Sequence, residues 1–443
     1  MAASGNRKRA AIVGGGIAGL TSAYLLGKAG VSVDLFEAED EIGGLARSFD
    51  FDGLKVERYY HFICLPDLHL VSLASELGLA QALKWTRTKT TFFYEGKLYP
   101  FTTPWDLLKF YPLPFSSRLK TGLETVRWRS LQNWEHLDDI SAKEFLVSTL
   151  GRKAYDVMWS PLLSMKFGEF EDSVSAAWLW HRIHRVANSR RSVIHPQVMG
   201  HFEGGTESLL KRLRERIAEQ GSEIFCRTPV QAVMVHSGRV SGIRVAGTTR
   251  EYDSVILTAP LPESAALLPD DLAKDRARLR EIPFIGVVCL TLWLDQTISG
   301  SFWCNIHDHR IPMNGIIDTS KLNPATGRGG ALVYVPHYLP TNSARFAFSD
   351  QELIDEFCRA LPLLKPAMSK NSIRAFRIFR SNYAQAICSI GFLKKKPAHA
   401  LGLKGLYLID STQMYPEDRT ISGTIGLAKT VSALVLKALA QDQ

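Results

Sequence analysis

Cysteine is scarce in this chain, and its placement indicates no cross-linked scaffold. Six cysteines are spread over 443 residues, with no CxxC pair and no other spacing typical of metal ligands. A disulfide framework and a cysteine-based zinc site are therefore excluded as organising features. We expect mostly buried thiols in a reducing compartment, and no metal site.

Long hydrophobic runs are also missing. No uninterrupted apolar segment reaches the roughly 20 residues that a membrane-spanning helix requires. The basic start, residues 1–9, leads directly into an apolar strand and lacks the hydrophobic segment of a signal peptide. These features predict a cytoplasmic location.

Acidic residues are outnumbered, because 44 Asp and Glu face 53 Lys and Arg, a formal net charge of +9. No recognition motif accompanies the basic clusters, so nucleic acid is not an expected partner. An anionic substrate or a membrane surface, such as the inner face of the membrane, fits this charge balance, and solvated helix faces are the alternative. Repeats and low-complexity tracts are absent too, and the length predicts two domains.

What the chain does contain is a βαβ unit of the kind that binds nucleotides. A strand, a GxGxxG turn, a helix and a second strand follow one another at residues 10–13, 14–19, 20–29 and 31–36. Gly14 allows a tight turn, Gly16 lets the backbone approach a pyrophosphate, and Gly19 lets helix and strand pack closely. Glu37 follows the second strand, where a carboxylate can bind ribose hydroxyls. The unit predicts a dinucleotide site, and a glycine-rich turn in an ordinary α/β protein is the alternative.

A second glycine motif follows this unit. Gly43 and Gly44 permit close backbone approach, and Arg47 can pair with a pyrophosphate. Further segments follow along the chain: a mainly helical block at 103–183, Gly-Gly-Thr before a helix at residue 207, and a strand after Pro229. Further on, a strand over 405–410 ends in Asp410 and a glycine-bearing helix begins near Ser422.

This order of segments resembles the FAD-dependent amine oxidase superfamily, which includes protoporphyrinogen oxidases, phytoene desaturases and UDP-galactopyranose mutases. The segment Gly43-Gly44-x-x-Arg47 is the most specific part, because it separates this superfamily from dehydrogenases that bind NAD in the same unit. The resemblance covers the FAD half of the chain in three separated segments. It implies an α/β fold with a discontinuous Rossmann-like FAD-binding domain and a second, substrate-binding domain made of a helical block and a mixed β-sheet.

The resemblance implies a cofactor role for several positions. Glu37 would bind the adenosine ribose, Arg47 the pyrophosphate and ribityl region, and the backbone of Val230 the adenine. Asp410 would lie near the ribityl chain, and the helix start at Ser422 and Gly423 would face the flavin pyrimidine edge, where a helix N-terminus stabilises negative charge. The whole expected FAD site comprises Gly14, Gly16, Ile17, Ala18, Gly19, Glu37, Ala38, Gly43, Gly44, Leu45, Ala46, Arg47, Val230, Asp410, Ser422 and Gly423.

The boundaries follow from the same segments. We expect the FAD-binding domain at residues 1–66, 195–260 and 385–443, and the substrate-binding domain at 67–194 and 261–384. The loop at 414–419 lacks a cysteine for covalent attachment and differs from that of monoamine oxidases. Non-covalent FAD is therefore expected, and simple amine oxidation is not.

Three residues are candidates for catalysis. His61 follows two tyrosines near the expected flavin and can act as an acid, as a base or in orienting substrate. Lys166 can hold a water or bind an anionic substrate, and Tyr383 can reach the substrate face of the ring. The alternatives are a structural histidine, a surface lysine and a tyrosine away from the site. Further basic candidates for carboxylate or phosphate groups are Arg182, Arg185, Arg190, Arg191 and Arg419.

One stretch mixes apolar and basic side chains in a way that fits a membrane interface. Its members are Leu107, Leu108, Phe110, Tyr111, Leu113, Phe115, Arg118, Lys120, Arg127, Trp128 and Arg129. The alternative is a buried lid or a core helix pair. Peripheral membrane contact therefore remains open.

Together these features predict an FAD-dependent oxidase, dehydrogenase or desaturase. It would take a hydride from a lipophilic or anionic small molecule, and oxygen or a quinone would reoxidise the flavin. A second GxGxxG unit for NADPH is absent. A flavin-dependent isomerase or mutase that runs no net redox reaction is one alternative, and a catalytically inert flavin-binding protein is another.

Overall fold

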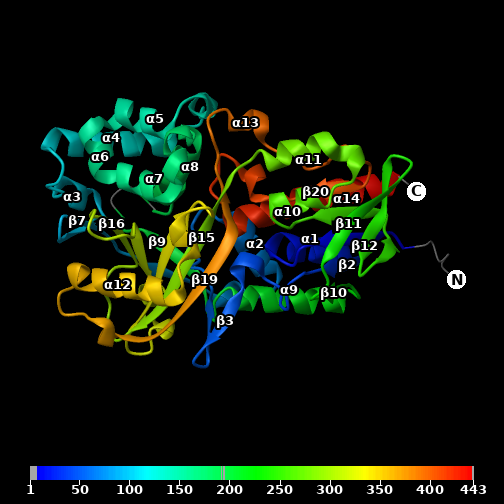
Figure 1. The fold of residues 1–443 in the computed structure, drawn as a ribbon, viewed down its shortest axis with the longest axis horizontal. Coiled ribbons are helices and arrows are strands. Elements are labelled where there is room, and N and C mark those ends of the chain that lie inside the picture. Colours follow the sequence, from blue (N-terminus) through cyan, green and yellow to red (C-terminus); the bar gives the residue numbers. More distant parts are fainter. Residues whose placement is uncertain (1–6, 191, 193–194, 442–443) are drawn as a thin grey trace.

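A five-stranded parallel sheet forms the centre of one half of the molecule, which we call the nucleotide half. The computed structural model describes residues 7–190, 192 and 195–441, and places this half on the right of Figure 1. The strands lie in the order β10 (Glu223–Phe225), β2 (Ser32–Phe36), β1 (Arg9–Val13), β14 (Ser254–Leu257) and β20 (Leu406–Leu408). Strands from three distant parts of the chain therefore meet in one sheet, as the discontinuous domain requires.

Both faces of this sheet are covered. One face packs on helices whose apolar residues recur at three and four, namely α1 (Ile17–Lys28), α2 (Leu68–Glu76), α9 (Glu207–Glu219) and α14 (Ile421–Gln441). The other face packs on a three-stranded antiparallel meander and two short helices, namely β11 (Val230–His236), β12 (Arg239–Val245), β13 (Thr248–Glu251), α10 (Leu261–Ala266) and α11 (Ala273–Arg280). This is the layered α/β arrangement expected from the βαβ unit.

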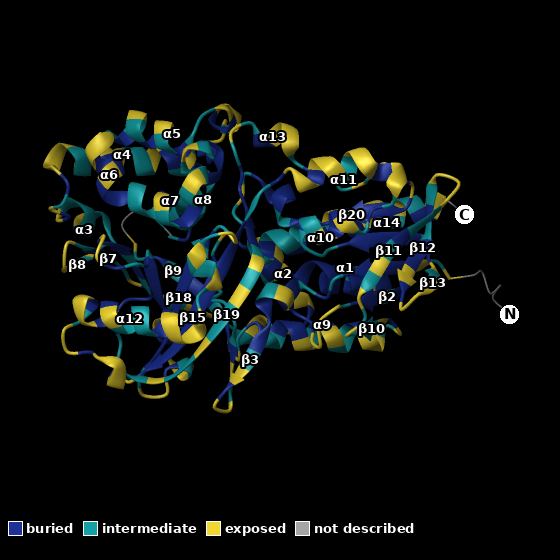
Figure 2. Ribbon diagram, in the orientation of Figure 1, coloured by how far each residue is buried: buried dark blue, intermediate teal, exposed yellow. Residues whose placement is uncertain are grey.

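The other half, the substrate half, is built on a seven-stranded mixed sheet. Its order is β19 (Ile373–Ala386), β15 (Phe284–Leu294), β18 (Ala331–Leu339), β17 (Gly315–Asp318), β16 (Trp303–His307), β7 (Thr90–Tyr94) and β8 (Lys97–Pro100). Only the β16–β7 pair is parallel among the pairings of this sheet in the described residues. β15 reads as a continuous apolar run because both of its faces are buried (Figure 2).

Helices cover this sheet. α12 (Asp350–Leu364) packs on one face, and Ser349 forms a capping box with Glu352 at its start. The helical block lies beyond the other face and contains α3 (Pro104–Leu108), α4 (Phe115–Ser130), α5 (Ala142–Leu150), α6 (Arg152–Met158), α7 (Ser160–Phe167) and α8 (Ala176–Asn188). The expected combination of a helical block and a mixed sheet is therefore present.

Short elements connect the two halves. They are β3 (Ser48–Phe51), β4 (Leu54–Glu57), β5 (Ile63–Cys64), β6 (Leu83–Arg87), β9 (Val198–Phe202) and α13 (Phe392–Lys395). A buried hydroxyl, that of Tyr415, donates to Asp138 and also contacts Ser175, so the loop before α14 is fastened to the helical block.

The halves differ from the expected boundaries at two places. α2 was assigned to the substrate half, yet Leu70 and Leu73 pack in the same core as α1 and α14. α10 and α11 were assigned there too, yet Leu261 and Leu279 pack beneath the five-stranded sheet. A change of pattern along the chain marks the end of a strand or helix, but it does not report which core the next helix joins.

Candidate active site

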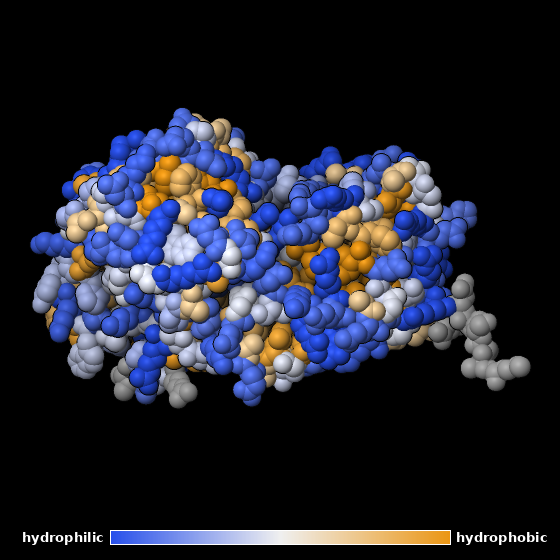
Figure 3. Space-filling view, turned by 90° about the horizontal axis from the view of Figure 1, so that it is seen from below, coloured by the Kyte–Doolittle hydropathy of each residue, from blue (hydrophilic) through white to orange (hydrophobic). Residues whose placement is uncertain are grey.

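A large cavity runs between the two halves. Its volume is about 1530 Å³, whereas pockets for one small ligand usually span about 300–1,000 Å³. The outline of the molecule narrows between the halves in Figure 3, where apolar patches interrupt a largely hydrophilic surface. The cavity has room for a dinucleotide and a second molecule.

The first glycine turn forms one end of the cavity. Gly14 has φ +110°, which only glycine adopts without strain, and its N–H donates to Phe36 O. A methyl group at Gly19 would lie 1.9 Å from Gly14 O, so this position must be glycine for α1 to pack against the turn. A methyl group at Gly16 would meet nothing within 4 Å, because Gly16 faces the cavity. The close packing of Gly19 also explains why it does not line the cavity.

The second glycine motif lies against the first. Gly43 N–H donates to Gly15 O at 2.8 Å, and Gly43 has φ +122°. Thr206 supports this loop from α9, since its hydroxyl donates to Ala46 O at 2.9 Å and its N–H donates to the buried carboxylate of Glu57. The Gly-Gly-Thr segment therefore holds the cofactor loop in addition to starting a helix.

Glu37 and Arg47 carry the charges at this end. One Glu37 carboxylate oxygen accepts Gly15 N–H at 2.6 Å and the other accepts Glu39 N–H at 2.9 Å, which fixes the carboxylate at the rim of the turn. The Arg47 side chain is buried and pairs with Asp40 and with Glu41. Both residues line the cavity.

More distant segments complete this end of the cavity. Val230 and Asp410 line it, and the Asp410 carboxylate accepts Thr412 N–H. Thr258, which sequence reasoning missed, donates from its hydroxyl to Gly14 O at 3.0 Å and so braces the turn. The expected residues that line the cavity are Gly14, Gly16, Ile17, Ala18, Glu37, Ala38, Gly43, Gly44, Leu45, Ala46, Arg47, Val230 and Asp410.

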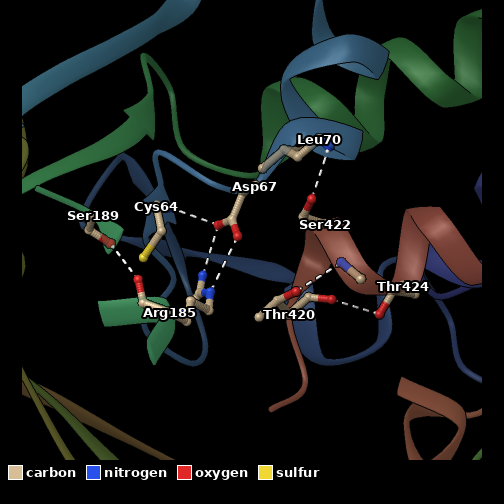
Figure 4. Close-up of polar contacts among 9 residues, drawn as sticks. Cys64, Asp67, Leu70, Arg185, Ser189, Thr420, Ser422 and Thr424 are labelled. Carbon is tan, nitrogen blue, oxygen red and sulfur yellow. Dashed lines mark hydrogen bonds and ion pairs between the residues drawn. The ribbon is translucent and has the colours of Figure 1, made fainter. Parts of the chain in front are cut away.

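The start of α14 is present but is turned differently from our expectation (Figure 4). Ser422 Oγ accepts Leu70 N–H from α2, and Gly423 N–H donates to Thr420 Oγ1. Neither residue lines the cavity, whereas Thr420, Ile421 and Thr424 do. The sequence located the helix end, but a short polar stretch does not reveal which of its residues faces inward.

His61 is the first of the three catalytic candidates. It lines the cavity, and its Nδ1 atom is buried without a hydrogen-bond partner in the described residues. Burial, followed by the positive charge of Arg419, lowers the pKa of His61 to about 4. The ring is therefore neutral at physiological pH and retains an unused polar atom.

Lys166 is buried, contrary to the surface alternative. Its ammonium lies 4.8 Å from the ring centre of Tyr338, 4.9 Å from that of Trp178 and 5.4 Å from that of Phe167. No carboxylate of the described residues pairs with it. Burial, then repulsion by Arg182 and Arg419, lowers its pKa well below the usual value.

A polar network surrounds this lysine. Arg182 pairs with Asp418 at 2.8 Å, and Arg419 donates to the hydroxyl of Tyr338 at 2.9 Å. Burial opposes ionisation of Asp418, but Arg182 and Lys166 outweigh it and lower the pKa of this carboxyl to about 2. Tyr338, which the sequence did not single out, thus joins the lysine to Arg419.

The other basic candidates with described side chains form no hydrogen bond with this network. Arg185 is neutralised by Asp67 through two hydrogen bonds (Figure 4). Arg190 lines the cavity further out and donates to a backbone carbonyl, and Arg191 lies outside the described residues. Tyr383, on β19, lines the cavity and packs edge-on against Phe284 with ring centres 5.9 Å apart.

A match to known proteins fits this geometry. Residues 17–385 match the family described as flavin containing amine oxidoreductase. The chain belongs to that family. The expected superfamily is thereby confirmed, and a flavin is its cofactor. The residues fit FAD, because a side chain at Gly16 would fill the cradle that opens into the cavity.

Relatives of this flavin oxidoreductase share part of its length. It is 25% identical over 293 residues to the mitochondrial protoporphyrinogen oxidase of Nicotiana tabacum, covering 57% of this chain and 58% of that protein. It is 24% identical over 285 residues to coproporphyrinogen III oxidase of Staphylococcus aureus (strain NCTC 8325 / PS 47), covering 57% and 60%. The match thus spans less than two thirds of either relative.

One solved structure shows the same fold over the whole chain. Reduced UDP-galactopyranose mutase superposes with a TM-score of 0.75 at 16% identity, covering 97% of this chain and 96% of that one. The expected α/β architecture with two domains is therefore confirmed. At this identity the likeness concerns the fold alone.

Proposed function

We propose that this protein oxidises a lipophilic or anionic small molecule in an FAD-dependent reaction. The observation that carries the proposal is one cavity that extends from the glycine cradle to His61, Lys166 and Tyr338. Bound FAD would supply the hydride acceptor, with oxygen or a quinone as the final electron acceptor. The relatives named as oxidases support this reaction class.

The chain's own residues would handle the proton and the charge. Loss of a hydride and a proton oxidises the substrate by two electrons, and the neutral ring of His61 can take the proton. Lys166 and Arg419 can orient an acidic group of the substrate. Tyr60, Tyr383 and Trp303 line the same region and exclude water from it.

Cofactor attachment is proposed to be non-covalent. No cysteine lines the cavity in the described residues, and the loop before α14 offers none. Denaturing the purified protein should release FAD into a filtrate. Flavin that stays with the polypeptide would contradict this part of the proposal.

The redox proposal can be tested with the purified holoenzyme. It should be yellow. After anaerobic photoreduction, oxygen or menadione should reoxidise the protein-bound flavin faster than the same acceptor reoxidises free reduced FAD. A colourless protein, or one reoxidised no faster than free flavin by either acceptor, would contradict a role in oxidation.

A mutase-type reaction is the second candidate, favoured by the fold shared with UDP-galactopyranose mutase. A mutase would need reduced flavin and would consume no acceptor. Under anaerobic conditions, UDP-galactopyranose should be converted by dithionite-reduced protein if this candidate holds. No conversion, together with acceptor-dependent turnover of another substrate, would exclude it.

Peripheral membrane contact is proposed for the α3–α4 surface. Its exposed apolar side chains are Trp105, Tyr111, Phe115, Leu119, Leu123 and Val126. Lys109, Arg118, Lys120 and Arg127 lie among them in sequence, a combination that suits anionic lipids. Phe110, Leu113 and Trp128 from the same stretch are buried, so it serves both as core and as surface.

α14 is a less suitable contact with a membrane. It is the one helix of the described part of the chain that is long and apolar enough to cross a bilayer, in spite of Lys429 and Lys437. Its residues Ile425, Ala428, Val431 and Val435 are nevertheless buried in the nucleotide half. We therefore interpret α14 as a core helix and place membrane contact at α3 and α4.

A further inference from the structure

The cavity extends beyond His61, Lys166 and Tyr338 and is also lined by residues of the helical block. Leu162 lies one turn before Lys166 on α7, and Val186 lies one turn after Arg182 on α8. Because residues four apart share one face of a helix, each helix presents a charged residue and then an apolar one to the cavity. One turn measures about 5.4 Å, so on each helix a charged and an apolar side chain line the cavity this close together, and on α8 Arg185 lines it as well.

The apolar wall leads to the surface at α4. Met158, Leu162, Ile183 and Val186 line it from α6, α7 and α8, and Leu107 and Leu123 line it from α3 and α4, beside polar side chains of the same helices that include Thr121, Arg129 and Arg185. Leu123 is 73% exposed, so the cavity reaches solvent beside it. We call this part of the cavity the apolar passage.

The inner end of the passage holds more basic than acidic groups. Arg182 pairs with Asp418, whereas Lys166 and Arg419 both contact Tyr338, and we call these three basic residues the cation cluster. Asp418 pairs with Arg182 only, so two cationic groups remain without a carboxylate partner in the described residues. Arg419 Nε is also buried without a hydrogen-bond partner. Buried positive charge is costly unless an anion compensates it.

We propose that the substrate of the oxidoreductase is an amphiphile whose single acidic head group binds the cation cluster and whose apolar chain lies in the passage toward α4. The inference rests on the proposed function and adds the substrate class to it. A head group of this kind, a carboxylate or a phosphate, would supply the missing negative charge beside the reacting region. The chain would replace water along the apolar side chains of the passage.

Calorimetric titration of the holoenzyme with four matched probes tests both parts. The probes are decyl phosphate, inorganic phosphate, 1-decanol and decyltrimethylammonium, all below their micellar concentrations. We expect decyl phosphate to bind at least tenfold more tightly than each of the others. Each buried methylene contributes about fourfold in affinity, so hexyl phosphate should bind more weakly than decyl phosphate by more than tenfold.

Two variants separate head from chain. Lys166→Met keeps the apolar length of the side chain. It should lower the affinity for decyl phosphate about tenfold without changing the affinity for decanol, while Lys166→Arg should bind decyl phosphate as tightly as the wild type does. Leu162→Asn should lower the affinity for decyl phosphate and for decanol but not the affinity for inorganic phosphate. Leu363→Asn, on the outer face of α12, is the control and should change none of them.

Several outcomes would overturn the inference. Equal affinity for inorganic phosphate and decyl phosphate would show that the apolar chain contributes nothing to binding. Equal affinity for decanol and decyl phosphate would show that the acidic head group contributes nothing. Tighter binding of coproporphyrin III, a flat tetracarboxylate, would favour a porphyrin-like substrate instead. A wild-type protein without flavin would refute the proposed function, whereas a yellow protein that fails to discriminate the probes would refute only the amphiphile.

Discussion

Gly16 differs from its neighbours in the first turn because it faces space rather than backbone. Its own backbone is extended, with φ −74° and ψ −177°, a conformation that valine adopts readily. Gly19, in contrast, abuts Gly14 O and has no room for any side chain. Of these two glycines, which are three residues apart, Gly16 thus leaves room for the cofactor, whereas Gly19 is required for the packing of the fold.

We predict that Gly16→Val abolishes FAD binding and leaves the fold intact, because its side chain fills the cradle. Gly19→Ala should instead lower the free energy of unfolding by at least about 2 kcal/mol through overpacking. Flavin absorbance per protein and the Tm of the flavin-free protein measure the two effects. A Gly16→Val protein that stays yellow would contradict the assignment of the cradle.

Buried histidines predict a loss of stability in acid. Burial lowers the pKa of His307 to about 4, while its value in the unfolded chain is about 6.5. The unfolded chain therefore binds more protons in this window, and stability falls as pH drops from 6.5 toward 4. The difference in the pKa of His307 between the two states should lower the free energy of unfolding by about 2 kcal/mol between pH 7 and pH 5.

Urea unfolding at pH 7.5 and pH 5 checks this expectation. His307 lies outside the cavity, where its Nδ1 atom is 2.9 Å from Val157 O, so cofactor binding does not complicate the comparison. His307→Gln should show a smaller difference between the two pH values than the wild type does. An unchanged difference would mean that His307 is not the titrating group.

Among the structural elements, the connection between α9 and the cofactor loop is the least expected. Thr206 stands directly before the predicted helix, but its hydroxyl donates to Ala46 O and makes no capping hydrogen bond. The helix therefore begins where predicted, while the side chain performs a different task. Thr206 holds a loop 160 residues earlier in the chain.

Thr206→Val should weaken FAD binding about tenfold, because it leaves the buried Ala46 carbonyl without its donor at a cost of about 1–3 kcal/mol. Ser208→Ala is the matched control, since that hydroxyl donates to Glu203 O at an exposed position. Fluorescence titration of flavin-free protein measures both dissociation constants. Equal losses in the two variants would argue against support of the loop.

Local patterns predicted much of the fold and of the FAD end of the site. Gly14, Gly43 and Glu37 sit in short motifs whose backbone demands can be read directly from neighbouring residues. Tyr338 and Thr258 could not be found this way, because each joins the site only through pairing of strands far apart in the sequence. The sequence also left open whether Lys166 is buried or on the surface, since its aromatic neighbours include a residue of β18.

At the scale of the whole molecule, the cavity and the exposed α3–α4 surface meet at Leu123. This side chain lines the outer passage and is largely exposed. A lipophilic molecule that leaves a bilayer at this surface would enter the passage without crossing water. The proposed contact and the proposed substrate class are thus consistent with each other.

We predict that the protein binds vesicles of phosphatidylcholine and phosphatidylglycerol more strongly than vesicles of phosphatidylcholine alone. Leu123→Glu should reduce the bound fraction about tenfold, since it replaces an inserted apolar side chain by a charge that anionic lipid repels. Co-sedimentation measures the bound fraction, and Leu363→Glu on α12 should not change it. Equal binding to both vesicle types would exclude the proposed surface.

The discontinuous sheet has a consequence for the order of events during synthesis. β1 and β2 leave the ribosome early, but their sheet is extended on the other side only after β14 and then β20 have been made. Asp410 and the start of α14 emerge later still, so a nascent chain carries the glycine cradle long before it can enclose a cofactor. Flavin capture should therefore mark a finished polypeptide, and pulse-labelled chains that end before Leu406 should not retain FAD.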